Sequence, residues 1–98
     1  MSSPVILRPE AEADVQEVYE YLEQIRVGLG KKFLGRLRDV LERIEAFPQL
    51  YGVVWQDVRA ARLKRFQYIV YHVTFADRVE VIAVMHGARR ASAWHRRL

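Results

Sequence analysis

Apolar residues in the first half of the chain recur at alternating intervals of three and four, which is the period of a helix with one buried face. The first predicted stripe consists of Ala11, Val15, Val18, Leu22 and Ile25. Pro9 is well placed in the first turn of this helix, where the missing N–H of proline is tolerated. Gly28 and Gly30 are expected to end the helix and turn the chain.

The same period continues into a second predicted helix, from about Lys31 to Phe47, which Pro48 stops. Its core stripe is expected to consist of Phe33, Leu37, Val40, Ile44 and Phe47, widened by Leu34 and Leu41. Two amphipathic helices joined by a tight turn form an antiparallel hairpin. The apolar face of such a hairpin needs a second layer to cover it.

The second layer is predicted to be a sheet, because the second half of the chain shows strand patterns. After a loop anchored by Tyr51 and Trp55, residues 58–66 (VRAARLKRF) alternate loosely and predict an edge-like strand with basic side chains. Residues 68–75 alternate strictly, with Ile69, Tyr71, Val73 and Phe75 on one face and Tyr68, Val70, His72 and Thr74 on the other. Residues 79–86 (VEVIAVMH) are nearly all apolar, as in a strand covered on both faces.

With a short extended segment at residues 5–7, these patterns predict an α+β fold. In it, the N-terminal strand and the helical hairpin pack on one face of a small antiparallel sheet. At 98 residues the chain is expected to be one domain, residues 1–98, because two domains would each lack a sufficient core.

The composition excludes several classes of protein. The absence of cysteine excludes disulfides, thiol nucleophiles and Cys-ligated zinc. The N-terminal residues lack the basic start and long apolar stretch of a signal peptide. No run approaches the roughly 18 apolar residues of a membrane span. A cytoplasmic protein without a membrane partner is therefore expected.

The net charge of +4 is distributed unevenly along the chain. Up to Asp57 there are 7 Lys/Arg residues against 10 Asp/Glu, whereas from Val58 onward there are 9 against 2. This asymmetry favours a negatively charged partner for the second half, either nucleic acid or an acidic protein segment. Basic residues that merely solubilise a sheet are the alternative.

The order of these elements and three motifs resemble the RelE/ParE superfamily of toxins from type II toxin–antitoxin modules. The motifs are the Arg-rich strand that leads into RFQYIVYHV, the strand that ends in VMHGARR, and the terminal tryptophan followed by basic residues. The resemblance covers nearly the whole chain and favours the ParE-like, plasmid stabilization branch.

The resemblance implies a small toxin of the RelE/ParE-like fold that a cognate acidic antitoxin wraps and silences in a hetero-oligomeric complex. The antitoxin segment is expected to be amphipathic and disordered when free. The superfamily also implies two alternative targets. RelE-like members cleave messenger RNA on the ribosome, whereas ParE-like members poison DNA gyrase.

Cleavage of RNA through its 2′-OH would need a base, an acid, and cations for the phosphorane charge. If the chain is RelE-like, the candidate catalytic residues are His86 for proton transfer and Arg65 and Arg89 for phosphate binding. The wider candidate surface for a target or an anion consists of Arg59, Arg62, Lys64, Arg65, Arg89, Arg90 and Trp94.

These residues also have structural interpretations. Arginines on an outer strand often form a solvated face that prevents edge pairing. His86, directly before Gly87, can hydrogen-bond local backbone at the strand end. His72 is expected to be a packed or half-exposed structural histidine, and His95 has no evident partner in the sequence. Trp94 is expected to fold back as a lid over the sheet, with a stacking platform for a base as the alternative.

Two departures from the nuclease pattern bear on the target. The nuclease branch typically ends in Tyr or a His–Tyr pair where this chain has Trp94, and an indole has no proton that titrates near neutral pH. Lys64 also stands alone among arginines where RelE-like nucleases use lysine-rich positions.

These departures favour a ParE-like toxin that inhibits DNA gyrase and is not an enzyme. A ribosome-dependent mRNA endoribonuclease and a non-toxic relic that only binds the antitoxin are the alternatives. Neither a metal nor a cofactor is predicted, because the three histidines lack ligand spacing and no Gly-rich phosphate loop is present.

Overall fold

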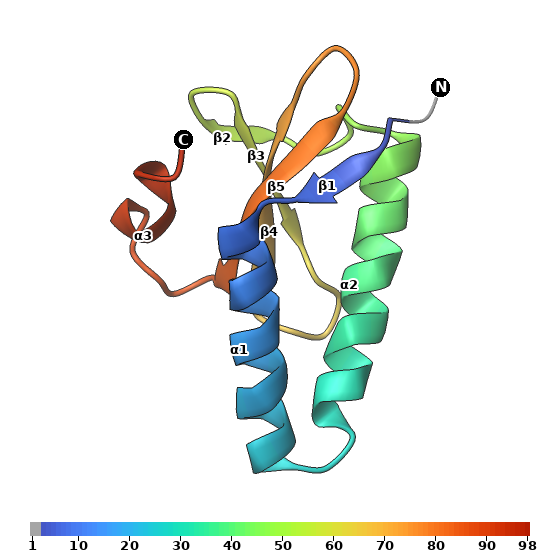
Figure 1. Cartoon of the computed structure of the whole chain (residues 1–98), viewed down its shortest axis with the longest axis vertical. Coiled ribbons are helices and arrows are strands. Elements are labelled where there is room, and N and C mark those ends of the chain that lie inside the picture. The colour runs from blue at the N-terminus through green and yellow to red at the C-terminus, as the bar shows by residue number, and fades with distance from the viewer. Residues whose placement is uncertain (1–2) are drawn as a thin grey trace.

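The computed structural model describes residues 3–98 as a five-stranded sheet with a helical hairpin on one face and a short C-terminal helix on the other (Figure 1). In chain order the elements are β1 (Val5–Leu7), α1 (Pro9–Ile25), α2 (Leu29–Ala46), β2 (Val53–Trp55), β3 (Val58–Arg62), β4 (Tyr68–Thr74), β5 (Val79–His86) and α3 (Ser92–His95). The predicted α+β fold, with the hairpin on one face of the sheet, is confirmed.

The turn between α1 and α2 is short because two glycines allow it. Gly28 has a φ of 92°, in the left-handed region that glycine adopts without strain. Gly30 lies in the first turn of α2, and a Cβ there would come within 2.7 Å of the Tyr19 side chain of α1. Glycine therefore permits the close approach of the two helices. The second helix begins at Leu29, so Gly30 belongs to the helix and not, as predicted, to the turn.

The strands follow the order β1-β5-β4-β3-β2. The sheet is mixed and not wholly antiparallel, because β1 pairs in parallel with β5, with Val5 opposite Val79. All other neighbouring strands are antiparallel. Parallel neighbours need a long crossover connection, which the helical hairpin and the three intervening strands provide. The N-terminal strand thus completes one edge of the sheet and does not lie on its face.

The strand predicted to be edge-like, β3, has neighbours on both sides along its first half. β2 pairs with it, Val53 lying opposite Arg59, so part of the predicted loop forms the outermost strand. A strand of three residues is too short to produce a periodic signal in the sequence. The last ladder contact between β2 and β3 runs from the Ala60 N–H to Gly52 O at 3.2 Å, and the outer edge of β3 is open beyond it.

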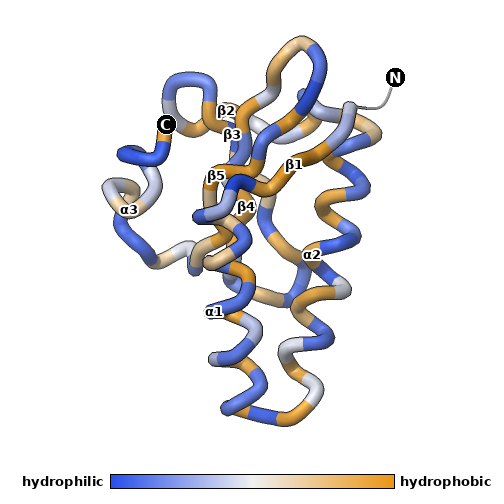
Figure 2. The backbone as a smooth tube through the Cα atoms, in the orientation of Figure 1, coloured by the Kyte–Doolittle hydropathy of each residue, from blue (hydrophilic) through white to orange (hydrophobic). Residues whose placement is uncertain are grey.

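Apolar side chains pack on both faces of the sheet. The inner cluster joins the hairpin to the sheet and includes Ala11, Val18, Leu22, Phe33, Leu37, Val40, Ile44, Val70, Val79, Val81 and Val84. The outer cluster consists of Val58, Tyr71, Val73, Ile82, Ala83, Met85 and Trp94. β5 contributes to both clusters, as predicted for a strand covered on both faces, and Figure 2 shows it as largely hydrophobic.

A bulge in β5 divides its side chains between the clusters. Tyr71 pairs with Ala83 and His72 pairs with Val81, so Ile82 is an extra residue between two ladder pairs. A bulge turns consecutive side chains toward one face. Ile82 and Ala83 accordingly both lie in the outer cluster.

Three residues predicted in the helical core stripes are exposed. Ile25 is 58% exposed, Phe47 is 62% exposed and Leu34 is 39% exposed. Ile25 ends α1 at the hairpin tip, which projects beyond the sheet (Figure 1). Phe47 is the C-cap of α2 and has left the helical conformation. Periodicity places a residue on a helix face, but it does not show how far the opposing layer extends.

Candidate functional site

β5 ends at His86, where the chain leaves the sheet toward the C-terminal arginines. His86 Nδ1 accepts a hydrogen bond from the Ala88 N–H at 3.0 Å, and the Gly87 N–H donates to Gln67 O at 2.7 Å. The imidazole lies edge-on against Tyr68, with ring centroids 5.5 Å apart. Nδ1 of His86 thus caps the strand end, and Nε2 has no hydrogen-bond partner among residues 3–98.

A hollow of about 270 Å³ lies beside His86, between α1 and the end of β5. Its polar lining comes from Asp14, Glu17, Tyr21, Tyr68, His86 and Arg89. Burial raises the pKa of the Tyr68 phenol, and the neighbouring Tyr21 adds to the effect. The Tyr68 hydroxyl therefore remains a hydrogen-bond donor at neutral pH.

The structure places His86 and Arg89 on this hollow together with Glu17 and Tyr68, which the sequence pattern had not singled out. The sequence pattern places Glu17 on the solvated face of α1 and Tyr68 in the alternating strand β4, so neither residue indicated a functional site. Only the packing of α1 across β5 brings these groups together.

Arg59 has a structural role on the inner side of the sheet. Its Nη1 donates to Tyr51 O at 2.6 Å and approaches Gln49 O at 3.4 Å. The side chain is half-buried and ties the segment before β2 to β3. Arg59 thus donates to backbone carbonyls within the protein. Its predicted role was to contact an anion.

The other candidate cations lie in separate surroundings. Arg62 Nη1 lies 3.9 Å from the position that a Cβ on Gly87 would take. Lys64 and Arg65 line two hollows beside α2. Arg89 lies at the hollow beside α1, and Arg90 is exposed in the segment after it. Arg62 and Lys64 thus line the same hollow, whereas Arg65 and Arg89 line two others.

Trp94 covers the outer face of the sheet. It is only 4% exposed, and its ring is stacked on Tyr71 with centroids 4.3 Å apart. Trp55 of β2 meets it edge-on at 6.0 Å. The predicted lid is confirmed, and the buried indole is not part of the exposed surface on which the arginines lie.

His95, for which the sequence indicated no partner, is stacked on Trp55. The ring centroids are 3.7 Å apart and the ring planes differ by 7°. That prediction was wrong because the partner lies in a distant strand that the sequence did not reveal.

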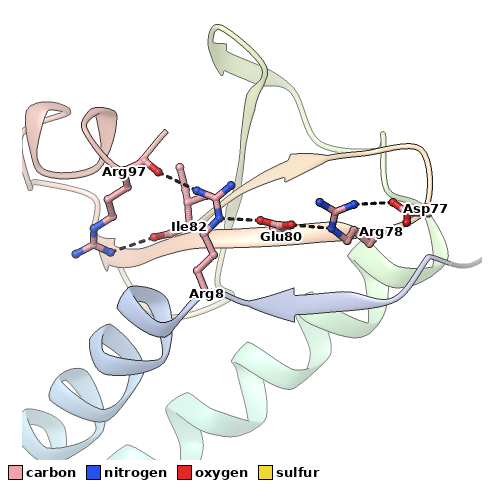
Figure 3. A network of polar contacts seen from close by, with 6 residues as sticks. All are labelled: Arg8, Asp77, Arg78, Glu80, Ile82 and Arg97. Carbon is pink, nitrogen blue, oxygen red and sulfur yellow. Dashed lines mark hydrogen bonds and ion pairs between the residues drawn. The ribbon is translucent and has the colours of Figure 1, made fainter.

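A chain of polar contacts fastens the C-terminal segment to the rest of the molecule (Figure 3). Arg97 Nη1 lies 2.6 Å from Asp14 Oδ2 of α1 and also donates to Ile82 O at 3.1 Å. Arg8 Nη1 donates to Arg97 O at 2.8 Å, and Arg8 Nε pairs with Glu80 at 2.8 Å.

The same chain of contacts continues along β5 to the turn before it. Glu80 also pairs with Arg78 at 2.7 Å, and Arg78 pairs with Asp77. Hydrogen bonds from Arg8 and then Arg78 lower the pKa of the Glu80 carboxyl, so it remains ionised well into the acid range. Nothing in the local sequence indicates these partners, because they come together only when β1, β5 and α3 are in place.

His72 is fully buried on the inner face of β4, so of the two predicted alternatives it is packed and not half-exposed. Its Nδ1 lies 3.3 Å from Val70 O, and Tyr51 packs edge-on against the ring at 6.1 Å. Burial is the main cause that lowers the pKa of His72 to about 4, and the charge of Arg59 acts in the same direction. The imidazole is therefore neutral at physiological pH.

Within residues 3–98, no group of three or more His, Asp or Glu side chains is arranged to hold a metal ion. In the same residues, no helix combines the length and the apolar character needed to cross a membrane.

Comparison with known proteins identifies the family. A family model described as "ParE toxin of type II toxin-antitoxin system, parDE" matches residues 5–91. The chain belongs to this family. It is the toxin component of a type II toxin–antitoxin module, as the sequence motifs implied, and its partner is an antitoxin.

The fold of this ParE-family toxin is also similar to a solved structure of the chromosomal ParDE TA system from P. aeruginosa. The TM-score is 0.65 at 14% sequence identity, and the match covers 87% of this chain and 96% of that chain. At this identity the likeness shows the shared fold. No curated protein sequence matches the chain.

Proposed function

We propose that this ParE-family toxin binds DNA gyrase and arrests DNA synthesis, and that an acidic cognate antitoxin holds it inactive. Membership of the family supports the toxin class, and the resemblance to the ParE branch implies gyrase as the target. One observation favours this target over RNA: Trp94, at the position where the nuclease branch carries a titratable residue, is buried against Tyr71.

Cleavage of RNA requires cations around one developing phosphorane and proton-transfer groups within hydrogen-bond reach of it. Arg62 and Lys64 line one hollow beside α2, Arg65 lines a second hollow beside α2, and Arg89 lines the hollow beside α1. Trp94 stands where the nuclease branch carries a titratable residue, and it is buried against Tyr71.

The target can be tested with purified proteins. Added to gyrase, ATP and relaxed plasmid, the toxin is expected to block supercoiling or to trap cleaved DNA. Relaxation of supercoiled plasmid by a type I topoisomerase, which serves as the control, should continue. In a bacterial host, pulse labelling after induction should show that DNA synthesis falls before RNA or protein synthesis. An early loss of protein synthesis with unimpaired gyrase would show that the proposed target is wrong.

Ribosome-dependent cleavage of mRNA is the second candidate, and the hollow beside His86 is the observation that favours it. Glu17, Tyr68, His86 and Arg89 offer a carboxylate, a phenol, an imidazole and a cation within one cavity of about 270 Å³. The substitution His86→Ala separates the two candidates. Under the gyrase proposal this variant keeps its toxicity, whereas under the nuclease alternative it loses toxicity while its fold and antitoxin binding persist.

The third possibility, a relic that only binds its antitoxin, has its own signature. Induction of the chain without the antitoxin would then leave growth unchanged, and the purified protein would neither inhibit gyrase nor cleave ribosome-bound mRNA.

A further inference from the structure

A short piece of the edge of β5 is open beyond the end of β1. β1 pairs with β5 only as far as Leu7 and Val81, so in the described part of the chain no strand lies beside the later residues of β5 on that side. The Val84 N–H on this edge donates to Asp14 Oδ2 at 3.0 Å. Because Asp14 and Val84 both line the hollow beside His86, this edge opens onto that hollow.

Two backbone groups on this edge have no partner. The Gly87 N–H donates toward β4, to Gln67 O at 2.7 Å, so the N–H of His86, one residue earlier, points away from β4. The C=O of Val84 points to the same side as the Val84 N–H. Within residues 3–98, no hydrogen bond uses the His86 N–H or the Val84 C=O. The hollow is thus bordered by an acceptor and, two residues further on, by a donor.

This acceptor and donor form a single isolated pair. Before them, Ile82 O accepts a hydrogen bond from Arg97 Nη1 at 3.1 Å. After them, His86 O accepts from the Arg89 N–H at 3.0 Å as the chain turns away from the sheet. A peptide that adds a strand to a sheet needs a run of such pairs, whereas a planar ring with one donor beside one acceptor needs only one. The edge therefore suits a flat heterocycle better than an extended peptide.

The side chains around the pair suit an aromatic base. Tyr21 and Tyr68 contribute two rings to the lining of the hollow, and Val18 and Met85 contribute apolar surface. Tyr21 is 57% exposed, so its ring has room to lie against a bound base. Aromatic side chains stack with every type of base, because each base has a π-face. The volume of about 270 Å³ is at the small end for a ligand site, which suits a base and part of its sugar.

The charged groups at the hollow suit the rest of a nucleotide. Within residues 3–98, neither Glu17 nor Arg89 takes part in an ion pair. A carboxylate such as that of Glu17 can accept hydrogen bonds from ribose hydroxyls, and a guanidinium such as that of Arg89 can bind a phosphate. The charge of Asp14 is balanced by Arg97, whose Nη1 lies 2.6 Å from Oδ2. Asp14 therefore repels a phosphate less than an unpaired carboxylate would.

We propose that this hollow binds a purine nucleotide whose base pairs with the Val84 C=O and the His86 N–H. Adenine and guanine each carry a donor beside an acceptor on the Watson–Crick edge, which is the edge that proteins read in an unpaired base. Two fused rings also give a purine more stacking surface than a pyrimidine has. The pairing uses the backbone of His86 and not its imidazole. The base can belong to a free nucleotide or to an unpaired purine of RNA.

The test is an NMR titration of the full ¹⁵N-labelled chain with AMP and with GMP. At least one of them should shift the amide signal of His86 with a dissociation constant of about 10 µM to 1 mM, and the amide of Gly52, before the distant strand β2, should not move. N6,N6-dimethyl-AMP and 1-methyl-GMP have blocked Watson–Crick edges and should bind about tenfold more weakly than their parent nucleotides. CMP and UMP should also bind more weakly than the purine nucleotide.

Two matched pairs of variants separate the contacts. Arg89→Ala should weaken binding of the nucleotide about tenfold and leave binding of the nucleoside unchanged, because only the nucleotide carries a phosphate. Arg90→Ala, at an exposed neighbouring position that does not line the hollow, should change neither. Glu17→Gln should weaken binding of nucleotide and nucleoside alike, whereas Glu20→Gln, exposed and outside the hollow, should not.

RNA pentamers identify the source of the base. If UUAUU or UUGUU binds no more tightly than the free purine nucleotide, the ligand is the nucleotide. Binding that is about tenfold tighter would assign the site to a purine of RNA and would support the second candidate function. In both cases UUUUU should bind more weakly, because it lacks the purine.

Several outcomes would overturn the proposal. They are no shift of the His86 amide with either purine nucleotide, equal binding of the blocked analogues, or equal binding of CMP and UMP. Equal shifts with ribose 5-phosphate, which has no base, would reduce the hollow to an anion site and would also overturn it. The titrations contain neither gyrase nor ribosomes, so their failure leaves the gyrase test unaffected, and failure of the gyrase test leaves these results unaffected.

Discussion

At the scale of single residues, His72 makes the stability of the toxin depend on pH. Its ring is fully buried between β4 and Tyr51, and its Nε2 has no hydrogen-bond partner in the described part of the chain. A charged imidazole at this position would lose its hydration and would lie near Arg59. The folded protein therefore resists protonation of a side chain that the unfolded chain protonates readily.

Between pH 6.5 and about pH 4, the unfolded state binds a proton at His72 that the native state does not bind. The free energy of unfolding should therefore fall as the pH drops through this window, by at most about 3 kcal/mol from this residue. Urea unfolding at pH 7 and pH 4.5 would measure the change. The variant His72→Leu should lack this part of the pH dependence, and equal slopes in both proteins would contradict the assignment.

At the scale of elements, the hairpin tip depends on one carboxylate. Glu23 accepts hydrogen bonds from the Gly28 N–H at 3.1 Å and from the Gly30 N–H at 2.7 Å. The bond from Gly28 is the main cause that lowers the pKa of Glu23. Glu23 thus satisfies backbone donors at the start of α2, as a capping side chain does.

The substitution Glu23→Gln is expected to loosen the hairpin tip, because a neutral amide oxygen accepts these bonds more weakly. Amide hydrogen exchange at Gly28 and Gly30 should become faster, while exchange in the sheet stays unchanged. Glu12→Gln, at an exposed position in the first turn of α1, is the control. Equal exchange at the two glycines in both variants would show that the carboxylate does not hold the turn.

The docking of α3 depends on Arg97, which joins it to α1 and β5. The substitution Arg97→Ala removes a partly buried ion pair and should lower the free energy of unfolding by about 1–3 kcal/mol. Quenching of tryptophan fluorescence by acrylamide should increase as α3 loosens, because Trp94 would become exposed and Trp55 would lose its stack on His95. Arg96→Ala, at the exposed neighbouring position, should change neither quantity. Unchanged quenching in the Arg97 variant would mean that the aromatic stack alone holds α3.

At the scale of the whole molecule, the sheet has two apolar faces and each needs its own cover. The hairpin covers the inner face, whereas seven C-terminal residues provide the cover of the outer one. A chain that ends at Ala91 should expose Tyr71, Ile82 and Met85, bind the dye ANS, and self-associate. A chain that ends at Arg96 keeps Trp94 and should show a smaller effect. A monomeric chain ending at Ala91 that binds no ANS would contradict this role of α3.

Only part of the candidate site could be predicted from the sequence. His86 and Gly87 could be placed at a strand end because an apolar run stops there. The sequence could not predict that His86 contacts Tyr68 or that it shares a hollow with Glu17 and Arg89. These contacts depend on how α1 crosses β5. The sequence also could not show that Arg62 and Lys64 line one hollow with α2, whereas Arg89 lines another beside α1.

The sequence by itself determined the two helices, the strands β3 to β5, the basic second half and the toxin family. These features depend on periodicity, composition and short motifs, which local residues encode. Only the tertiary structure decided that β1 lies parallel to β5, that β2 forms an edge, that Trp55 stacks on His95 and that Arg97 pairs with Asp14. Each of these contacts joins segments that are distant along the chain, so it is specified by register and packing and leaves no local pattern in the sequence.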